Sequence, residues 1–156
     1  MEVLLRDKKF QTMQERHCYE ILEYLIRKKI SFSILCSVER VKFEPSLPQE
    51  IRNAFSELTL FILAGYTFES LELDGKNLYF EAGFGEENVG SFVTAPLDSI
   101  VQILLPNDDG LQSDFCIYVN LFATFSKIAP SPAEEEGVNS SMQALLANPK
   151  NKRFKK

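Results

Sequence analysis

The sequence predicts an α+β domain: an N-terminal helix followed by a small, mostly antiparallel β-sheet with one short helix. Two observations lead to this prediction. Apolar residues recur with helical spacing over residues 10–29, and after them the apolar spacing falls to two, as in strands. The chain has 156 residues, 45% of them hydrophobic, which suffices for a single core. We therefore expect one folded domain over residues 1–128 and a disordered tail over residues 129–156.

The N-terminal helix has a broad apolar surface. Cys18, Leu22 and Leu25 form one stripe, Tyr19 and Ile26 lie on a neighbouring stripe, and charged residues form the opposite face. One interpretation is that the whole apolar width faces the core. The other is that Tyr19, Leu22 and Ile26 contact a second copy of the helix in a homodimer.

Period-two alternation predicts the strands, with turn residues between them. Strands are expected at residues 32–38, 41–43, 58–64, 68–73, 78–84, 91–95 and 115–125. The chain should bend between Val38 and Val41, and Asp74-Gly75 should begin a tight hairpin connection. Pro96 is expected to open a short helix over residues 97–104. Apolar residues on both faces of the last strand predict that it is covered on both sides.

Charge is unevenly distributed along the chain. The formal net charge is −5, yet residues 129–156 carry five basic and three acidic side chains. Since the body of the chain is acidic, nucleic-acid binding is not expected, and an Sm-like RNA-binding module is the weakest interpretation.

The sequence also indicates a cytoplasmic protein. It has no run of about 18 uncharged apolar residues, so we expect no membrane contact. The N-terminus lacks the apolar segment of a secretory signal. Cys18, Cys36 and Cys116 are far apart and lie in apolar patterns, which predicts buried reduced thiols rather than disulfides or a metal site.

No catalytic centre or cofactor site is recognisable. The single histidine, His17, lies within the first helix, and Gly83-Phe84-Gly85 lacks the spacing of a nucleotide-binding loop. Adjacent carboxylates such as Glu86 and Glu87 belong to a turn, where they are usually solvated. We therefore expect a non-enzymatic protein without a cofactor that binds an extended peptide along a sheet edge.

Four runs of residues resemble those of a known family. They are Leu60 to Ala64, Leu71-Glu72-Leu73, Phe80-Glu81-Ala82-Gly83-Phe84 and Ala95-Pro96-Leu97. These runs resemble the SspB family, stringent starvation protein B, an adaptor of the ClpXP protease. The resemblance implies a homodimer of small domains, each with a barrel-like β-sheet whose groove binds the ssrA degradation tag. It also implies that the protein delivers tagged proteins to ClpXP. The implied peptide-binding residues are Leu63, Ala64, Tyr66, Phe80, Ala82, Gly83 and Phe84.

The resemblance implies a role for the tail as well, and it includes one departure. The end of the tail would dock on the ClpX ATPase through Lys152, Arg153, Phe154 and Lys155. Gly83 stands where the family has arginine, so a cation expected beside an acidic tag is missing. The ligand is therefore an ssrA-type tag or another extended peptide.

The main alternative is a type III secretion chaperone. Such chaperones are also acidic cytoplasmic dimers with a leading amphipathic helix and a twisted antiparallel sheet, and they bind an extended secretion substrate. They usually continue into a final amphipathic helix. Here the chain instead ends in residues rich in Pro, Glu, Ser and Lys.

Overall fold

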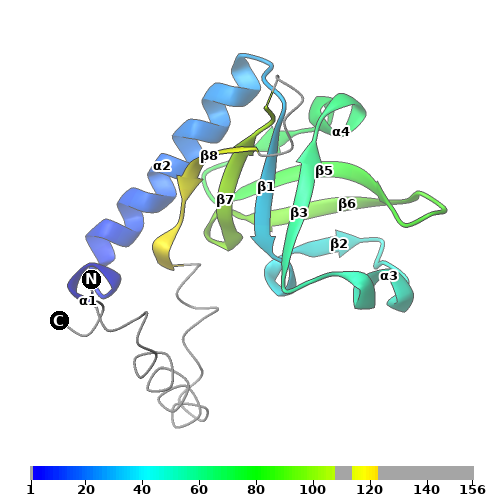
Figure 1. Ribbon diagram of the computed structural model, residues 1–156, viewed down its shortest axis with the longest axis horizontal. Helices are drawn as coiled ribbons and strands as arrows, with labels where there is room; N and C mark the ends of the chain where they lie inside the picture. Colours follow the sequence, from blue (N-terminus) through cyan, green and yellow to red (C-terminus); the bar gives the residue numbers. More distant parts are fainter. Residues whose placement is uncertain (1, 108–113, 123–156) are drawn as a thin grey trace, which may run out of the picture. The chain divides into compact units, whose positions relative to one another are not determined.

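The computed structural model of the chain describes residues 2–107 and 114–122. A long N-terminal helix and two four-stranded antiparallel sheets form this part of the chain (Figure 1). The α+β class predicted from the sequence is therefore confirmed. The predicted tail, residues 129–156, and the ClpX-docking residues within it lie outside the described residues.

The elements follow one another closely along the chain. The helices are α1 (Glu2–Leu5), α2 (Lys8–Arg27), α3 (Gln49–Ala54) and α4 (Gly65–Glu69), and two single 3-10 turns are η1 (Val38–Arg40) and η2 (Leu97–Ser99). The strands are β1 (Phe32–Ser37), β2 (Lys42–Glu44), β3 (Leu58–Leu63), β4 (Glu72–Leu73), β5 (Asn77–Phe84), β6 (Val89–Pro96), β7 (Ile100–Leu105) and β8 (Phe115–Val119). Sheet A has the order β3-β1-β7-β8, and sheet B has the order β2-β6-β5-β4.

Helix α2 begins at a side-chain cap. The Asp7 carboxylate accepts hydrogen bonds from the backbone N–H groups of Lys9 and Phe10, at 2.9 and 3.4 Å. These amides belong to the first turn, where no helical carbonyl is available to them, so the cap stabilises the start of the helix. The apolar stripe of the helix faces the core as predicted, and its buried residues are Cys18, Leu22 and Leu25.

Helix α2 is also attached to the segment at and after β8. The Tyr118 hydroxyl donates a hydrogen bond to the backbone carbonyl of Gln14 at 3.1 Å. The side-chain oxygen of the same Gln14 accepts from the backbone N–H of Leu121 at 3.0 Å. One helical residue therefore holds both Tyr118 and the chain that follows β8.

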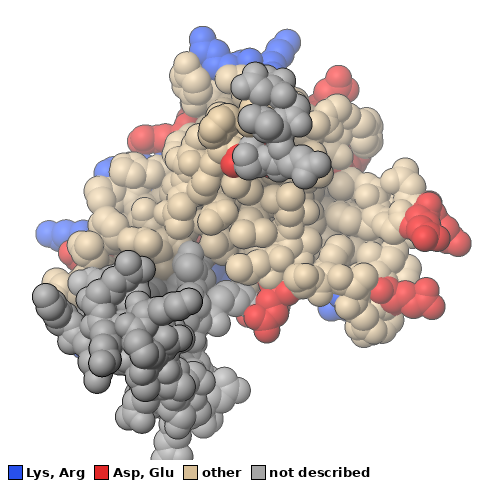
Figure 2. Space-filling model, viewed as in Figure 1, with Lys and Arg blue, Asp and Glu red and all other residues tan. Residues whose placement is uncertain are grey.

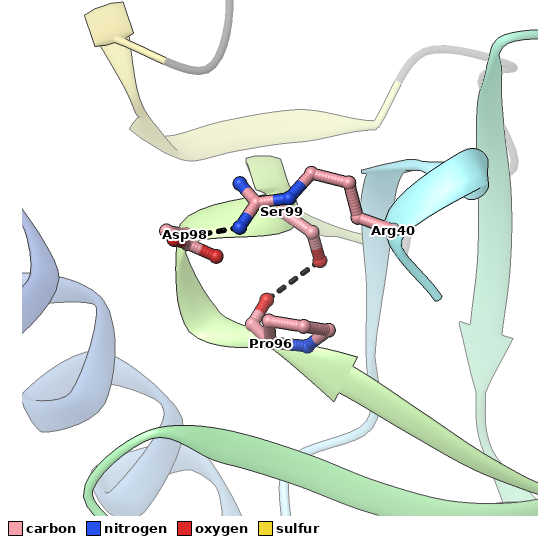
Figure 3. Close-up of polar contacts among 4 residues, drawn as sticks. All are labelled: Arg40, Pro96, Asp98 and Ser99. Atoms are coloured by element: carbon pink, nitrogen blue, oxygen red, sulfur yellow. Dashed lines mark hydrogen bonds and ion pairs between the residues drawn. The ribbon is translucent and has the colours of Figure 1, made fainter. Parts of the chain in front are cut away.

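Two bends at one corner connect the sheets. Turn η1 takes the chain from β1 in sheet A to β2 in sheet B, and η2 takes it from β6 in sheet B to β7 in sheet A. Because β1 pairs with β7 and β2 pairs with β6, both ladders turn at the same place. Arg40 and Asp98 form an ion pair of 2.9 Å across this corner, and the Ser99 hydroxyl donates to the Pro96 carbonyl at 2.6 Å (Figure 3). The bent ladders produce the predicted barrel-like arrangement.

An aromatic cluster fills the space between the sheets. Phe61 of sheet A lies 5.7 Å from Phe80 and 6.2 Å from Phe84 of sheet B, measured between ring centroids. Phe43 lies 6.3 Å from Phe61, and Phe55, which follows α3, stacks on Phe43 at 5.7 Å. Most of these pairs are tilted or edge-to-face, the geometry that aromatic rings prefer.

The hairpin predicted at Asp74-Gly75 is confirmed. Strands β4 and β5 pair with Leu73 opposite Leu78. The Asp74 carboxylate accepts from the backbone N–H groups of Lys76 and Asn77 at 2.8 and 2.7 Å, which closes the connection.

The helix predicted over residues 97–104 is wrong. Only η2 is helical there, and β7 begins at Ile100. Its residues Ile100, Val101 and Ile103 are all buried. A nearly continuous apolar run of this kind belongs to a strand covered on both faces, and in a short segment it also satisfies helical spacing.

Two predicted strands are shorter than expected. Residues 65–69 form α4, which starts where Gly65 adopts a φ of +57°, and only Glu72–Leu73 pair as a strand. Strand β8 ends at Val119, and its described part is not covered on both sides. Phe115 is 60% exposed, and Tyr118 is the buried residue of this strand.

The cysteines differ from the prediction at one position. Cys18 and Cys36 are buried as expected, but Cys116 is exposed. Burial raises the pKa of the Cys18 thiol to about 12 and raises the pKa of the Cys36 thiol as well. Neither buried thiol therefore ionises near neutral pH.

We predict that native protein treated briefly with iodoacetamide is alkylated at Cys116 alone, because Cys18 and Cys36 are buried and protonated. Peptide mass spectrometry identifies the alkylated residue. All three cysteines should react after unfolding in guanidinium, and Cys116→Ser should abolish the native reaction. Rapid native alkylation of Cys18 or Cys36 would contradict the described core.

Candidate peptide-binding site

A hollow of about 610 Å³ lies against sheet B. It is bounded by the end of β2, the start of α4 and the middle of the β5–β6 hairpin. Four of the predicted peptide-binding residues line it, namely Ala64, Tyr66, Ala82 and Gly83. The structure therefore brings together two segments that are well separated in the sequence.

Three other predicted residues do not line this hollow. Leu63 and Phe80 have no exposed surface, so the prediction that they contact a peptide is wrong. Both belong to the core because alternate residues of β3 and β5 face inward. Phe84 is only partly buried, but it packs in the aromatic cluster, 5.5 Å from Phe43.

The predicted dimer contacts also need correction. Leu22 is fully buried in the core of its own chain, so it is not available to a second copy. Tyr19 and Ile26 are partly buried and pack against the same core. The buried stripe of α2, which includes Leu22, therefore packs against its own domain.

The edge of β5 beside the hollow has an unusual partner. Strand β4 pairs with β5 only at Leu78 and Tyr79. Two residues beyond Tyr79, the Ser70 hydroxyl accepts a hydrogen bond from the backbone N–H of Glu81 at 2.8 Å, as a strand carbonyl would. Backbone groups alternate in direction along a strand, so those of Gly83 point to the same side as those of Glu81. Among the described strands, none pairs with Gly83 on that side.

The side chain of Asn88 leaves no room for a side chain at Gly83. A Cβ atom at this position would lie 1.8 Å from Oδ1 of Asn88. Asn88 ends the β5–β6 turn with a φ of +52°, and its side chain lies over Gly83. The arginine found here in the SspB family therefore does not fit unless Asn88 moves.

The charged residues that line the hollow are carboxylates. Glu44 and Glu81 are both lining residues, and no Lys, Arg or His is among the described lining residues. The Tyr66 hydroxyl donates a hydrogen bond to Glu81 at 2.5 Å, which raises the pKa of Tyr66. More acidic residues, Glu86 and Glu87, lie in the β5–β6 turn, whose end is coloured as acidic in Figure 2.

Sequence reasoning missed Glu44, Asn88 and Phe92. Glu44 and Phe92 are direct cross-strand neighbours in the β2–β6 ladder, and Phe92 also lies opposite Glu81 in the β5–β6 ladder. Such neighbours become apparent only when the register of three strands is known. The turn from Gly85 to Asn88 would have given the register of the β5–β6 hairpin.

The described residues offer little for other kinds of site. They contain no group of three or more His, Cys, Asp and Glu side chains able to hold a metal ion. Within the same residues, no helix has the length and apolar character needed to cross a bilayer. His17 is exposed on α2.

The chain was compared with known proteins. It matches no protein-family model, and no curated protein matches it either. The SspB resemblance consequently remains a prediction.

We predict that Gly83→Ala destabilises the protein by about 1 kcal/mol, because the new methyl group displaces the Asn88 side chain. The destabilisation should disappear in an Asn88→Gly background, since glycine tolerates the positive φ of that residue. Gly90→Ala is the matched control, because a Cβ atom there meets nothing within 4 Å. Urea denaturation measures all the variants. Equal effects of Gly83→Ala in the two backgrounds would show that Asn88 does not occupy this space.

Proposed function

We propose that the chain is a non-enzymatic domain that binds an extended peptide in the hollow beside β5. One observation carries the proposal. Ala64 and Tyr66, which follow β3, line the same hollow as Ala82 and Gly83 of β5. They are four of the seven residues that the SspB resemblance implies for the peptide groove.

The proposed binding mode has two components. The open edge of β5 at Gly83 offers main-chain hydrogen bonds to an extended peptide, and the hollow offers space for its side chains. Tyr66, which is 69% exposed, would contribute a large contact surface at the rim. Each component alone is common on protein surfaces, and their adjacency supports the proposal.

By its resemblance to SspB, the domain is further proposed to be a cytoplasmic adaptor that delivers proteins with ssrA-type tags to ClpXP. The unpaired state of Cys18, Cys36 and Cys116 is compatible with a reducing compartment. A homodimer is part of this proposal, although its contacts must lie outside the buried stripe of α2.

We predict that a fluorescently labelled ssrA-type tag peptide binds the full chain saturably, with micromolar or tighter affinity. Gly90→Gln should weaken this binding at least tenfold. Gly90 lines the hollow, and open space surrounds its Cβ position, so the new side chain should fill the hollow without disturbing the fold. Fluorescence anisotropy with an unlabelled competitor measures the affinity.

Gly75→Gln is the control for this experiment. Its Cβ position is equally open, but Gly75 lies in the β4–β5 connection and does not line the hollow. Binding that survives Gly90→Gln unchanged would place the peptide elsewhere, and no binding at all would remove the ssrA-type tag as a ligand.

A tail variant tests the adaptor role separately. We predict that serine at Lys152, Arg153, Phe154 and Lys155 leaves peptide affinity unchanged but abolishes the stimulation of ClpXP degradation of a tagged fluorescent protein. Wild-type chain with an untagged substrate is the control. If the variant still stimulates degradation, the tail is not the docking segment. If the wild-type chain binds peptide but never stimulates degradation, the secretion-chaperone alternative gains support.

A further inference from the structure

We propose that the outward face of sheet A binds a second copy of the chain, so that two such faces pack against each other in a homodimer. This inference rests on the proposed function, since it names the contacts of the homodimer that is included there. The surface concerned lies on the other sheet from the peptide-binding hollow.

The strand register determines which side chains of sheet A point away from the core. Directly opposite residues of an antiparallel pair share one face of the sheet. Ile34 of β1 lies opposite Phe61 and Ile103, and all three are buried, so this row faces inward. Its neighbours Ser33 and Leu35 therefore face outward, since side chains alternate along a strand. Two outward rows cross the sheet, namely Ile62, Ser33, Leu104 and Cys116, and Leu60, Leu35, Gln102 and Val119.

These outward rows are uncharged and mostly apolar. None of the eight residues carries a charge, and five of them are aliphatic. Ile62 is 69% exposed, Leu60 45% and Val119 41%, so the described part of the chain leaves them open to solvent. The outer face of an antiparallel sheet is normally polar where it meets water. Adjoining exposed apolar side chains instead mark a surface that contacts another molecule.

Sheet B provides an internal comparison. Its outward face carries Lys42 and Glu44 on β2, Glu72 on β4 and Glu81 on β5, and all four are exposed. Sheet B therefore has the charged outer face expected of a solvated sheet. The uncharged outer face is particular to sheet A and is not a general property of this fold.

The charge of the chain favours a second copy as the partner. Residues 1–128 carry nineteen acidic and twelve basic side chains, so two copies repel each other in most orientations. Contact through the outward face of sheet A brings no charged strand residue from either copy into the centre of the interface. Depletion of charge is typical of the core of such interfaces, and homodimer interfaces are the more apolar ones. An acidic peptide or a nucleic acid would find no opposite charge on these strands.

The shape of the surface fits the same partner. Sheets pack face to face about 10 Å apart, with the side chains of the two faces interdigitating. A twofold axis presents the same patch from both copies, so each uncharged row meets an uncharged row. None of the outward residues of sheet A lines the hollow on sheet B. The proposed dimer therefore leaves the peptide site of each copy accessible.

Lysine substitutions at opposite edges of the face test the inference. The full chain should sediment as a dimer in analytical ultracentrifugation. Ile62→Lys on β3 and Val119→Lys on β8 should each raise the dimer dissociation constant at least tenfold, because each dimer would bury two added cations. Both side chains are exposed in the single chain, so the fold should tolerate lysine, which thermal unfolding checks. Val3→Lys is the matched control, since Val3 is exposed on α1 outside the sheet.

The reactivity of Cys116 gives a second measurement, because Cys116 continues one outward row on β8. Iodoacetamide should alkylate it rapidly in dilute protein, where the monomer predominates, and more slowly at concentrations that favour the dimer. Ile62→Lys should remove this dependence on concentration.

The outcomes separate this inference from the peptide-binding proposal. A monomeric wild-type chain overturns the inference, and so does a dimer that survives both lysine substitutions or is equally weakened by Val3→Lys. Anisotropy with the labelled ssrA-type peptide measures binding in the same variants, and its affinity should not change. A monomer that binds the peptide leaves only peptide binding standing. A dimer that dissociates as expected but binds no peptide leaves only the interface standing.

Discussion

The corner at which the two sheets meet is the constraint on which the rest of the structure depends. Turns η1 and η2 bend two paired ladders together, so that neighbouring strands leave sheet A and enter sheet B side by side. The Arg40–Asp98 ion pair spans this corner, but both side chains are more than 40% exposed, and such pairs contribute about 1 kcal/mol or less. Backbone pairing on both sides of the bend therefore holds the corner, and the ion pair adds little to its stability.

The core and the candidate site both follow from this corner. Because the sheets face each other, Phe61 of sheet A meets Phe80 and Phe84 of sheet B and closes the interior. Phe80 and Phe84 of β5 belong to that cluster, whereas Glu81, Ala82 and Gly83 line the hollow. Strand β2 is short and ends at Glu44, which leaves the hollow open beside β6.

Much of the fold could be predicted from the sequence, because each successful element has one clear period. Helix α2 spans many turns, and the alternation along β5 runs without interruption. The predictions were wrong where a short apolar run fits both the helical and the strand spacing of apolar residues. Residues 97–104 have helical spacing, yet the pairing of β7 with both β1 and β8 decides their conformation. At Gly65, a positive φ starts helix α4, which includes the first residues of the strand predicted over residues 68–73.

The candidate site was predictable only in part. A family resemblance selects positions along a strand, but it does not separate inward from outward residues, and so Leu63 and Phe80 were grouped with Tyr66 and Gly83. The alternation of apolar residues along β5 would have placed Phe80 in the core. The pairing of Glu44 with Phe92 depends on a register between distant strands, which a single sequence does not reveal.

The contact between Gly83 and Asn88 has a consequence for how this sequence can change over evolutionary time. Asn88 ends the turn that follows β5, and its side chain uses the space that any larger residue at position 83 would need. Mutational order therefore matters. A lineage that first shortens residue 88 can then acquire a side chain at 83, whereas the reverse order passes through a less stable intermediate.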